Sequence, residues 1–371
     1  MDIFVYGTLR SAALMAAVAG AGPLRSVPAS VSAFEVCPLA GNVVPFIRPA
    51  SARTAFGLVW QDLTADQVRR LDLYEGAFGY RLETVVVQTD EGPREAKFYL
   101  PPEGSLAGEG SWSLERWETD HLAPALLAAA EIFALDPAPD HAQLRAMWPM
   151  IEARAWSRHR AKAGPATARY AAGVDDFDLI TARPQHGDFF RFQSLDIQHR
   201  RFDGQRSDIL TREGFFGVDA AIVLPYDPVR DRVLLVEQAR LGPRLRNDPN
   251  PWMLEPVAGI VDARETPQDA ALREAREEAG IAITRLEPAA GFYVSPGAST
   301  DYFYTFVGLC DLPRSEPYMG GLPEEGEDLR VHPLSFDAAM ALADSGEVAT
   351  GPALFLLYWL LRHRDRLRAA V

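Results

Sequence analysis

Four glutamates lie close together between Gly259 and Ile281, in the stretch GIVDARETPQDAALREAREEAGI. Glu274 precedes Glu277 by three residues and Glu278 by four, spacings that place side chains on one edge of a helix. Like charges at these spacings destabilise an isolated helix, so we expect a cation to balance them. Carboxylates, carbonyls and water are the ligands that Mg²⁺ and Mn²⁺ favour, which makes this edge a candidate metal site. A solvated face of an acidic protein is the alternative.

The residues around the glutamates predict the elements that position them. The strand-like run WMLEPVAGIVD (252–262) leads into a turn just before the acidic stretch. Gly280 can end the helix as its C-terminal cap. Small side chains would allow this helix to pack closely, and they are Ala270, Ala271, Ala275 and Ala279.

The spacing of this segment resembles the Nudix box. Five residues separate Gly259 from Glu265, seven more lead to the pair Arg273 and Glu274, and Glu277, Glu278, Gly280 and Ile281 follow in register. The family usually carries a larger aliphatic residue where this chain has Ala275. The resemblance implies a hydrolase with an α/β/α sandwich that uses Mg²⁺ or Mn²⁺ to cleave a diphosphate joined to a nucleoside.

The same resemblance implies a set of metal ligands and a general base. The ligands would be the carbonyl of Ala258 and the carboxylates of Glu274 and Glu278, with Glu277 as a ligand or a neighbour of one. Glu265 can fix Arg273 by a charge-assisted hydrogen bond. The loop GGLPEEGEDL (320–329) offers Glu325 as the base and Glu327 as a further ligand. A shift of one or two positions stays open, because Glu324 and Asp328 are adjacent, and a solvated acidic loop is the alternative.

Residues flanking the box resemble the ADP-ribose pyrophosphatase subgroup over about 175–371. The segment YVSPGAST (293–300) carries Pro296 fifteen positions past Ile281, in a turn that can bring N–H groups close to an anion. The resemblance implies hydrolysis of ADP-ribose to AMP and ribose 5-phosphate. The implied contacts are Arg240 to phosphate or the terminal ribose, Phe189 and Arg212 to adenine, and Asp301, where the family often has Glu, to a ribose hydroxyl.

In that subgroup the stacking aromatic comes from the partner subunit, which implies a homodimer through the Nudix domain with exchanged N-terminal strands. Two other functions stay open for this half of the chain. One is hydrolysis of another nucleoside or sugar diphosphate. The other is a sensor that binds ADP-ribose without turnover, against which the complete set of metal carboxylates weighs.

The N-terminal segments VYGTLR (5–10) and LDLYEGAFGYR (71–81) together resemble the γ-glutamylcyclotransferase-like family. The resemblance implies that Glu75 deprotonates the α-amine of a γ-glutamyl compound, which then attacks its own γ-carbonyl and closes 5-oxoproline. Backbone N–H groups of the turn Tyr6, Gly7, Thr8 and Leu9 would bind the substrate carboxylate or the developing oxyanion. The alternatives are a binding or dimerising module, or a cyclotransferase that is the physiological activity of the whole chain.

The pattern along the chain predicts an α+β protein with two domains. Strand-like runs occur in residues 1–100, and the resemblance implies a γ-glutamylcyclotransferase-like β-barrel with helices over residues 1–113. Residues 114–173 read as a helical connector and residues 174–371 as the Nudix domain.

Composition limits the classes of binding partner and the cellular compartment that we expect for the protein. The 371 residues carry a net charge of −14, so nonspecific binding to nucleic acid or to an anionic membrane is not expected. Two cysteines, Cys37 and Cys310, argue against a disulfide framework and favour a reducing cytoplasm. No signal peptide is expected, and the apolar run ALFLLYWLL (353–361) is too short to span a bilayer.

Overall fold

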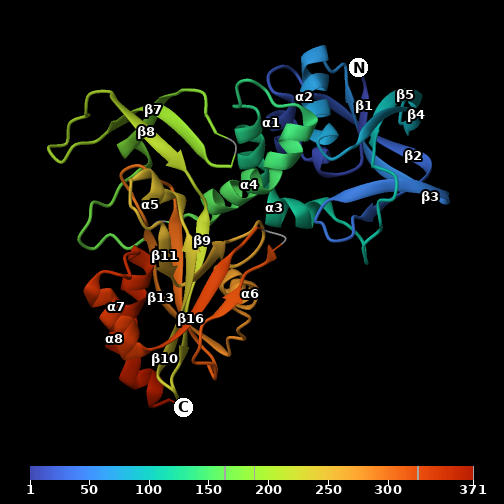
Figure 1. Ribbon diagram of the computed structural model, residues 1–371. Coiled ribbons are helices and arrows are strands. Elements are labelled where there is room, and N and C mark those ends of the chain that lie inside the picture. Colours follow the sequence, from blue (N-terminus) through green and yellow to red (C-terminus); the bar gives the residue numbers. More distant parts are fainter. Residues whose placement is uncertain (163, 188, 324–325, 371) are drawn as a thin grey trace. The chain divides into compact units, whose positions relative to one another are not determined.

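The computed structural model describes residues 1–371 except 163, 188, 324–325 and 371. Its chain divides into two compact units, Met1–Arg212 and Glu213–Val371, and each unit contains buried apolar clusters of its own (Figure 1). Both units mix helices with strands, so the predicted two-domain α+β class is confirmed. None of the helices in the described residues is long and apolar enough to cross a bilayer.

The first unit is built on a closed barrel of five strands in the order β1-β3-β2-β4-β5. β1 runs parallel to β5, with Ile3 opposite Lys97, and the other neighbours are antiparallel. Closure leaves no barrel strand with an unpaired edge. The strands are β1 (Ile3–Val5), β2 (Arg25–Pro38), β3 (Pro45–Gln61), β4 (Arg81–Thr89) and β5 (Gly92–Leu100).

Four α-helices of this unit share a core with one face of the barrel. Trp117, Ile132 and Ile151 belong to the same buried cluster as Ile3 and Val5. The residues predicted as a connector therefore pack as part of the barrel domain. The helices are η1 (Thr8–Arg10), α1 (Ala12–Ala19), α2 (Ala65–Gly76), α3 (Leu114–Ile132), α4 (His141–Arg160) and η2 (Val174–Asp176), where η marks a 3₁₀ helix.

A separate three-stranded sheet, in the order β6-β7-β8, follows the helices. Its strands are β6 (Phe177–Ala182), β7 (Arg191–His199) and β8 (Leu210–Phe216), so β8 crosses the division at 212/213. The sequence analysis places this segment in the C-terminal domain from residue 174, whereas most of it groups with the first unit. Arg191 of β7 accounts for the difference, because it lies 3.7 Å from Glu131 of α3 and donates to the sulfur of Met147 in α4 at 3.2 Å.

The second unit contains a mixed eight-stranded sheet with the order β13-β14-β9-β10-β16-β15. β11 pairs with β10, β12 pairs with β9, and β14 lies parallel to β9. The strands are β9 (Asp219–Asp227), β10 (Arg232–Ala239), β11 (Trp252–Glu255), β12 (Val257–Ile260), β13 (Arg285–Tyr293), β14 (Tyr302–Leu309), β15 (Tyr318–Gly320) and β16 (Leu329–Ser335).

Helices cover this sheet on both sides, because apolar side chains alternate along its central strands. Ile222 and Leu224 of β9 belong to the cluster that contains α7 and α8, whereas Ala221 and Val223 belong to the cluster that contains α6 (Figure 1). This gives the α/β/α layering that the sequence predicts. The helices are α5 (Leu241–Leu245), α6 (Pro267–Ala279), α7 (Phe336–Ser345) and α8 (Gly351–Arg368).

Candidate active site

Local signals determine where α6, which carries the acidic stretch, begins and ends. The Thr266 hydroxyl accepts the Asp269 N–H at 3.1 Å, and Pro267 occupies the first turn, where its missing N–H costs nothing. Gly280 ends the helix in the left-handed region, at φ 63°, where a side chain would be strained. The alanines of its inner face are buried against the sheet, and Glu274 and Glu278 are buried on the same side of the helix.

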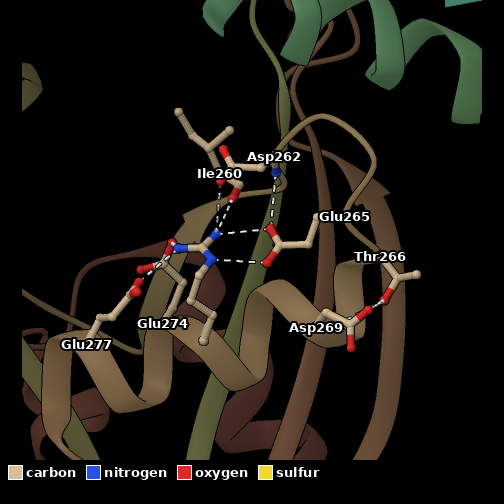
Figure 2. Close-up of polar contacts among 8 residues, drawn as sticks. Ile260, Asp262, Glu265, Thr266, Asp269, Glu274 and Glu277 are labelled. Atoms are coloured by element: carbon tan, nitrogen blue, oxygen red, sulfur yellow. Dashed lines mark hydrogen bonds and ion pairs between the residues drawn. The ribbon is translucent and has the colours of Figure 1, made fainter. Parts of the chain in front are cut away.

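Arg273 is the cation that balances these carboxylates, and its partners Glu265, Glu274 and Glu277 are labelled in Figure 2. Its Nε and one terminal nitrogen donate to the two oxygens of Glu265, both at 3.0 Å. The other terminal nitrogen donates to Glu274 at 2.6 Å and to Glu277 at 2.9 Å. A further bond of 3.1 Å to the Ile260 carbonyl ties the guanidinium to β12. One planar side chain thus holds three carboxylates in place.

Glu274 lies directly against the backbone of β12 at Gly259. A Cβ atom at Gly259 would lie 1.7 Å from Oε1 of Glu274, so the carboxylate occupies the space that any other side chain would need. Burial raises the pKa of Glu274, and the charge of Arg273 opposes that effect. The glycine is required for close approach, and its neighbour is a largely desolvated carboxyl group.

Glu278, one turn further along α6, is more deeply buried and is 3% exposed. Burial is the largest effect on its pKa, which is raised to about 8. The Ala258 N–H donates to its carboxylate at 3.2 Å and lowers the pKa, whereas the negative charges of Glu274 and Glu327 raise it. Glu327 itself accepts the Leu322 N–H at 3.0 Å. The structure therefore brings acidic side chains from α6 and from the loop before β16 close enough to repel one another.

In this arrangement the described residues contain no group of three or more acidic, histidine or thiol side chains able to hold a metal ion. Glu274 and Glu277 bind Arg273, and the predicted base Glu325 lies outside the described residues. The chemistry of the donors nevertheless fits a divalent cation. They are hard oxygen ligands, buried and mutually repelling, and Glu278 has an elevated pKa for that reason.

The flanking residue Arg240 lies at the start of α5, where its Nε donates to Glu255 of β11 at 2.7 Å. Its positive charge also acts on Glu278 and lowers the pKa of that carboxyl group, against the larger effect of burial. Arg240 is therefore a cation beside the acidic cluster, positioned by a carboxylate of its own.

Pro296 lies in an exposed turn in which the Ser299 N–H donates to the Ser295 carbonyl at 2.8 Å. Asp301, just after it, has both oxygens engaged within the protein. One accepts the Val218 N–H at 3.3 Å, and the other accepts the Ser299 hydroxyl at 2.6 Å. The side chain predicted to bind a ribose hydroxyl thus fastens the turn to the start of β9, a contact across 83 residues that no local pattern indicates.

Phe189 and Arg212 both belong to the first unit, in the loop before β7 and in β8. The ring of Phe189 is 53% exposed and meets Phe190 edge to face at 4.7 Å between centroids. Arg212 is exposed and donates to the Thr211 carbonyl at 2.8 Å. Within the described part of the chain, the Arg212 guanidinium lies over no aromatic ring.

The N-terminal candidate residues meet at one end of the barrel. Tyr6 follows β1 directly, and its hydroxyl donates to the Tyr99 carbonyl of β5 at 2.9 Å. Thr8 and Leu9 form a 3₁₀ turn after Gly7, closed by the Arg10 N–H bonded to the Gly7 carbonyl at 3.1 Å.

Glu75 lies in the last turn of α2, where burial raises its pKa to about 7. Tyrosines surround this carboxylate, and the sequence analysis identified only the first of them, Tyr6. Burial raises the pKa values of Tyr74, Tyr80 and Tyr99, and the charge of Glu75 raises them further. The Tyr99 hydroxyl is buried without a hydrogen-bond partner among the described residues. Tyr74 and Tyr80 stand within the segment LDLYEGAFGYR itself, so their spacing from Glu75 was a usable signal.

Comparison with known proteins identifies both halves of the chain. Residues 217–348 match the family model described as NUDIX domain, and residues 3–118 match the model described as gamma-glutamyl cyclotransferase, AIG2-like. ADP-ribose pyrophosphatase of Escherichia coli (strain K12) is 36% identical to this chain over 196 residues, which cover 53% of this chain and 93% of that protein. The chain belongs to the Nudix hydrolase family.

Other Nudix relatives carry two kinds of name. ADP-ribose pyrophosphatase of Haemophilus influenzae is 34% identical over 187 residues, covering 50% of this chain and 86% of that protein. GDP-mannose pyrophosphatase of Enterobacter sp. is 30% identical over 149 residues, covering 40% and 76%. The Nudix match contains Arg273, its carboxylate partners and Asp301, whereas Phe189 and Arg212 precede it. The predicted enzyme class and the cyclotransferase-like N-terminal domain are confirmed.

Proposed function

We propose that the Nudix domain hydrolyses ADP-ribose to AMP and ribose 5-phosphate with Mg²⁺ or Mn²⁺. One observation carries the proposal. The buried carboxylates of α6, ordered by Arg273 against Gly259, occur in a chain that is 36% identical to an ADP-ribose pyrophosphatase over 93% of its length. The domain assignment is a Nudix domain within 174–371 and a cyclotransferase-like domain within 1–113, with β6 and β7 packing on the first unit.

Each residue of the acidic cluster has a proposed role. Glu274, Glu278 and Glu327, with the Ala258 carbonyl and with Glu277 as a ligand or neighbour, hold the ion. A bound divalent ion neutralises the diphosphate and lowers the pKa of a water ligand. Arg273 and Glu265 orient the Glu274 carboxylate, and Gly259 leaves space for it. Glu325 removes the proton from the attacking water.

Substrate contacts complete the proposal. Arg240 binds the diphosphate or the terminal ribose, and the turn at Pro296 offers N–H groups to the same anion. Asp301 holds that turn and also accepts from a ribose hydroxyl, because each of its oxygens can accept a second hydrogen bond. Phe189 and Arg212 stack on adenine.

We propose further that the protein is a cytoplasmic homodimer. The sheet β6-β7-β8 exposes apolar side chains in number, which is unusual for a surface that stays in water. They are Phe177, Leu179, Ile180 and Phe192.

The decisive experiment measures AMP release from ADP-ribose by the full chain with Mg²⁺. GDP-mannose and other nucleoside diphosphate sugars serve as competing substrates in the same assay, because one group of relatives bears that name. A value of kcat/KM highest for ADP-ribose supports the proposal. A higher kcat/KM for another diphosphate would make that compound the substrate of this Nudix hydrolase. Binding of ADP-ribose without turnover of any substrate would indicate a sensor.

A second activity is favoured by the surroundings of Glu75. A carboxyl group whose pKa is raised to about 7, beside the turn Tyr6–Leu9, is suited to remove a proton from an amine near neutral pH. We propose that the N-terminal domain cyclises γ-glutamyl amines to 5-oxoproline. Release of 5-oxoproline from a panel of γ-glutamyl amines tests this, and no release from any of them would leave a binding module.

A further inference from the structure

A cavity of about 710 Å³ lies at the C-terminal end of α6, within the second unit. Residues of α6, of β15 and of the loop after β14 line it, and Leu234 and Leu312 form a buried apolar part of its wall. The volume is typical of small-molecule sites, which measure about 300–1,000 Å³. Within the described part of the chain the lining does not include Glu274, Glu278 or Glu327, so the cavity is distinct from the acidic cluster.

The carboxylates that line the cavity are both paired with arginines. Glu277 accepts from a terminal nitrogen of Arg273 at 2.9 Å. Asp311, just after β14, accepts from a terminal nitrogen of Arg230. Their negative charges are therefore balanced by the protein itself.

The hydroxyl groups of the lining also have partners. The Tyr318 hydroxyl of β15 donates to the Ala279 carbonyl at the end of α6 at 2.8 Å. The Thr284 hydroxyl donates to the Leu309 carbonyl at 2.9 Å. Both hydroxyls hold the wall of the cavity together, and their protons are not free to bind a ligand.

Two guanidinium groups complete the polar lining. Arg276 lies in the last turn of α6 and Arg314 in the loop after β14, and both are exposed. Among the described residues neither guanidinium has a hydrogen-bond or ion-pair partner, and Arg314 lies over the Tyr318 ring, 4.7 Å from its centroid. Each guanidinium carries five N–H donors, so the cavity presents an excess of positive charge and of donors.

The loop that carries Arg314 is fixed by the sheet behind it. A terminal nitrogen of Arg232 in β10 donates at 3.3–3.4 Å to three successive carbonyls, those of Leu312, Pro313 and Arg314. The Leu312 N–H donates to Asp227 of β9 at 3.0 Å. A backbone ordered in advance lowers the entropy cost of binding.

We propose that this cavity binds a phosphomonoester that carries an apolar ring. Such a compound has about two negative charges near pH 7, which match the two guanidiniums in number. Guanidiniums donate paired hydrogen bonds to phosphate oxygens, and the apolar wall with the Tyr318 ring accommodates the ring of the ester. Apart from Glu277, which Arg273 holds, no lining residue has a role in the proposed hydrolysis.

The test is isothermal titration calorimetry of phenyl phosphate against the full chain, with a chelator present to remove divalent metal. We expect one equivalent to bind, and Arg276→Gln and Arg314→Gln each to weaken binding at least about tenfold, because each removes charged hydrogen bonds. Arg244→Gln changes an exposed arginine of α5 outside the cavity and is the matched control, with unchanged affinity. Inorganic phosphate should bind at least about tenfold more weakly, because it buries no ring.

Arg240→Gln separates this cavity from the proposed hydrolytic site, where Arg240 binds the diphosphate or the terminal ribose, and it should not change the affinity for phenyl phosphate. Weaker binding in Arg240→Gln, with normal affinity in Arg276→Gln and Arg314→Gln, would place the phosphate at the hydrolytic site and overturn the proposal. No binding of phenyl phosphate, or equal binding of inorganic phosphate, would overturn it as well.

A measurement on the wild type needs no substitution. Phenyl phosphate at saturation should slow hydrogen exchange in residues 311–321, which contain Arg314 and Tyr318, and leave exchange in β1 to β5 unchanged. Unchanged exchange in 311–321 would refute the assignment of this cavity. None of these measurements depends on turnover of ADP-ribose, so the outcome is independent of the proposed substrate.

Discussion

Replacing Glu75 by Gln should make the N-terminal unit more stable above neutral pH. Burial raises the pKa of Glu75 from an ordinary 4.5 to about 7, so the folded protein retains a proton that an unfolded chain releases. The stabilisation from this protonated form is complete below about pH 4.5 and is lost as the pH rises through about 7. The difference corresponds to about 3 kcal/mol at most, because one pKa unit corresponds to about 1.4 kcal/mol.

The assay is urea denaturation of the full chain at several pH values, read by hydrogen exchange in the barrel strands β1 to β5. Glu75→Gln should gain up to about 3 kcal/mol over the wild type at pH 8 and almost nothing at pH 4.5. Glu83→Gln, an exposed carboxylate of β4, is the control and should shift neither value. A gain that does not vary with pH, or a loss of stability at pH 8, would refute the reasoning. In the wild type, 5-oxoproline release should rise with pH through about 7, and Glu75→Gln should have none.

Three further predictions concern the Nudix site. Gly259→Ala should lower kcat for ADP-ribose about 100-fold, since its Cβ would displace the Glu274 carboxylate. Gly351→Ala, whose Cβ meets open space, is the control and should leave kcat unchanged. A kcat for Gly259→Ala equal to that of the wild type would show that catalysis tolerates displacement of the carboxylate. Glu278→Gln should reduce Mg²⁺-dependent AMP release at least about 100-fold with an unchanged thermal transition. The control Glu347→Gln changes an exposed glutamate and should leave AMP release unaltered. Near wild-type turnover of Glu278→Gln at low Mg²⁺ would contradict the ligand assignment. Glu325→Gln should lower kcat about 10²- to 10⁴-fold, and a larger loss for Glu327→Gln with little effect at Glu325 would transfer the base to another residue.

Features encoded over short spans were predictable from the sequence. The ends of helix α6 follow from Thr266, Pro267 and Gly280, because a capping hydroxyl, a missing N–H and a missing side chain each favour a helix end. The pairing of Glu265 with Arg273 spans eight residues across one turn and one helix, so charge and spacing were sufficient to predict it.

Contacts between distant segments were not predictable in this way. Asp301 reads as a free carboxylate after a turn, and only the fold reveals that the Val218 N–H, 83 residues earlier, occupies one of its oxygens. The Tyr99 hydroxyl reads as part of an ordinary strand, because nothing local indicates that β5 brings it beside the α2 helix. Both cases depend on strand neighbours that are fixed by tertiary packing.

The boundary between the two units also depends on contacts between distant segments. The Pro- and Gly-containing stretch 163–173 has the composition of a linker, so composition places the boundary there. Glu131 and Arg154 look in sequence like solvated helix charges, although they are buried and paired with each other. Because a buried ion pair requires both partners in place, removing α3 and α4 from the segment that follows would remove the Glu131 carboxylate that lies 3.7 Å from the Nε of Arg191. The composition of this stretch therefore indicates only that residues 164–173 are exposed. The buried pair of Glu131 and Arg154 indicates which segments require one another to fold.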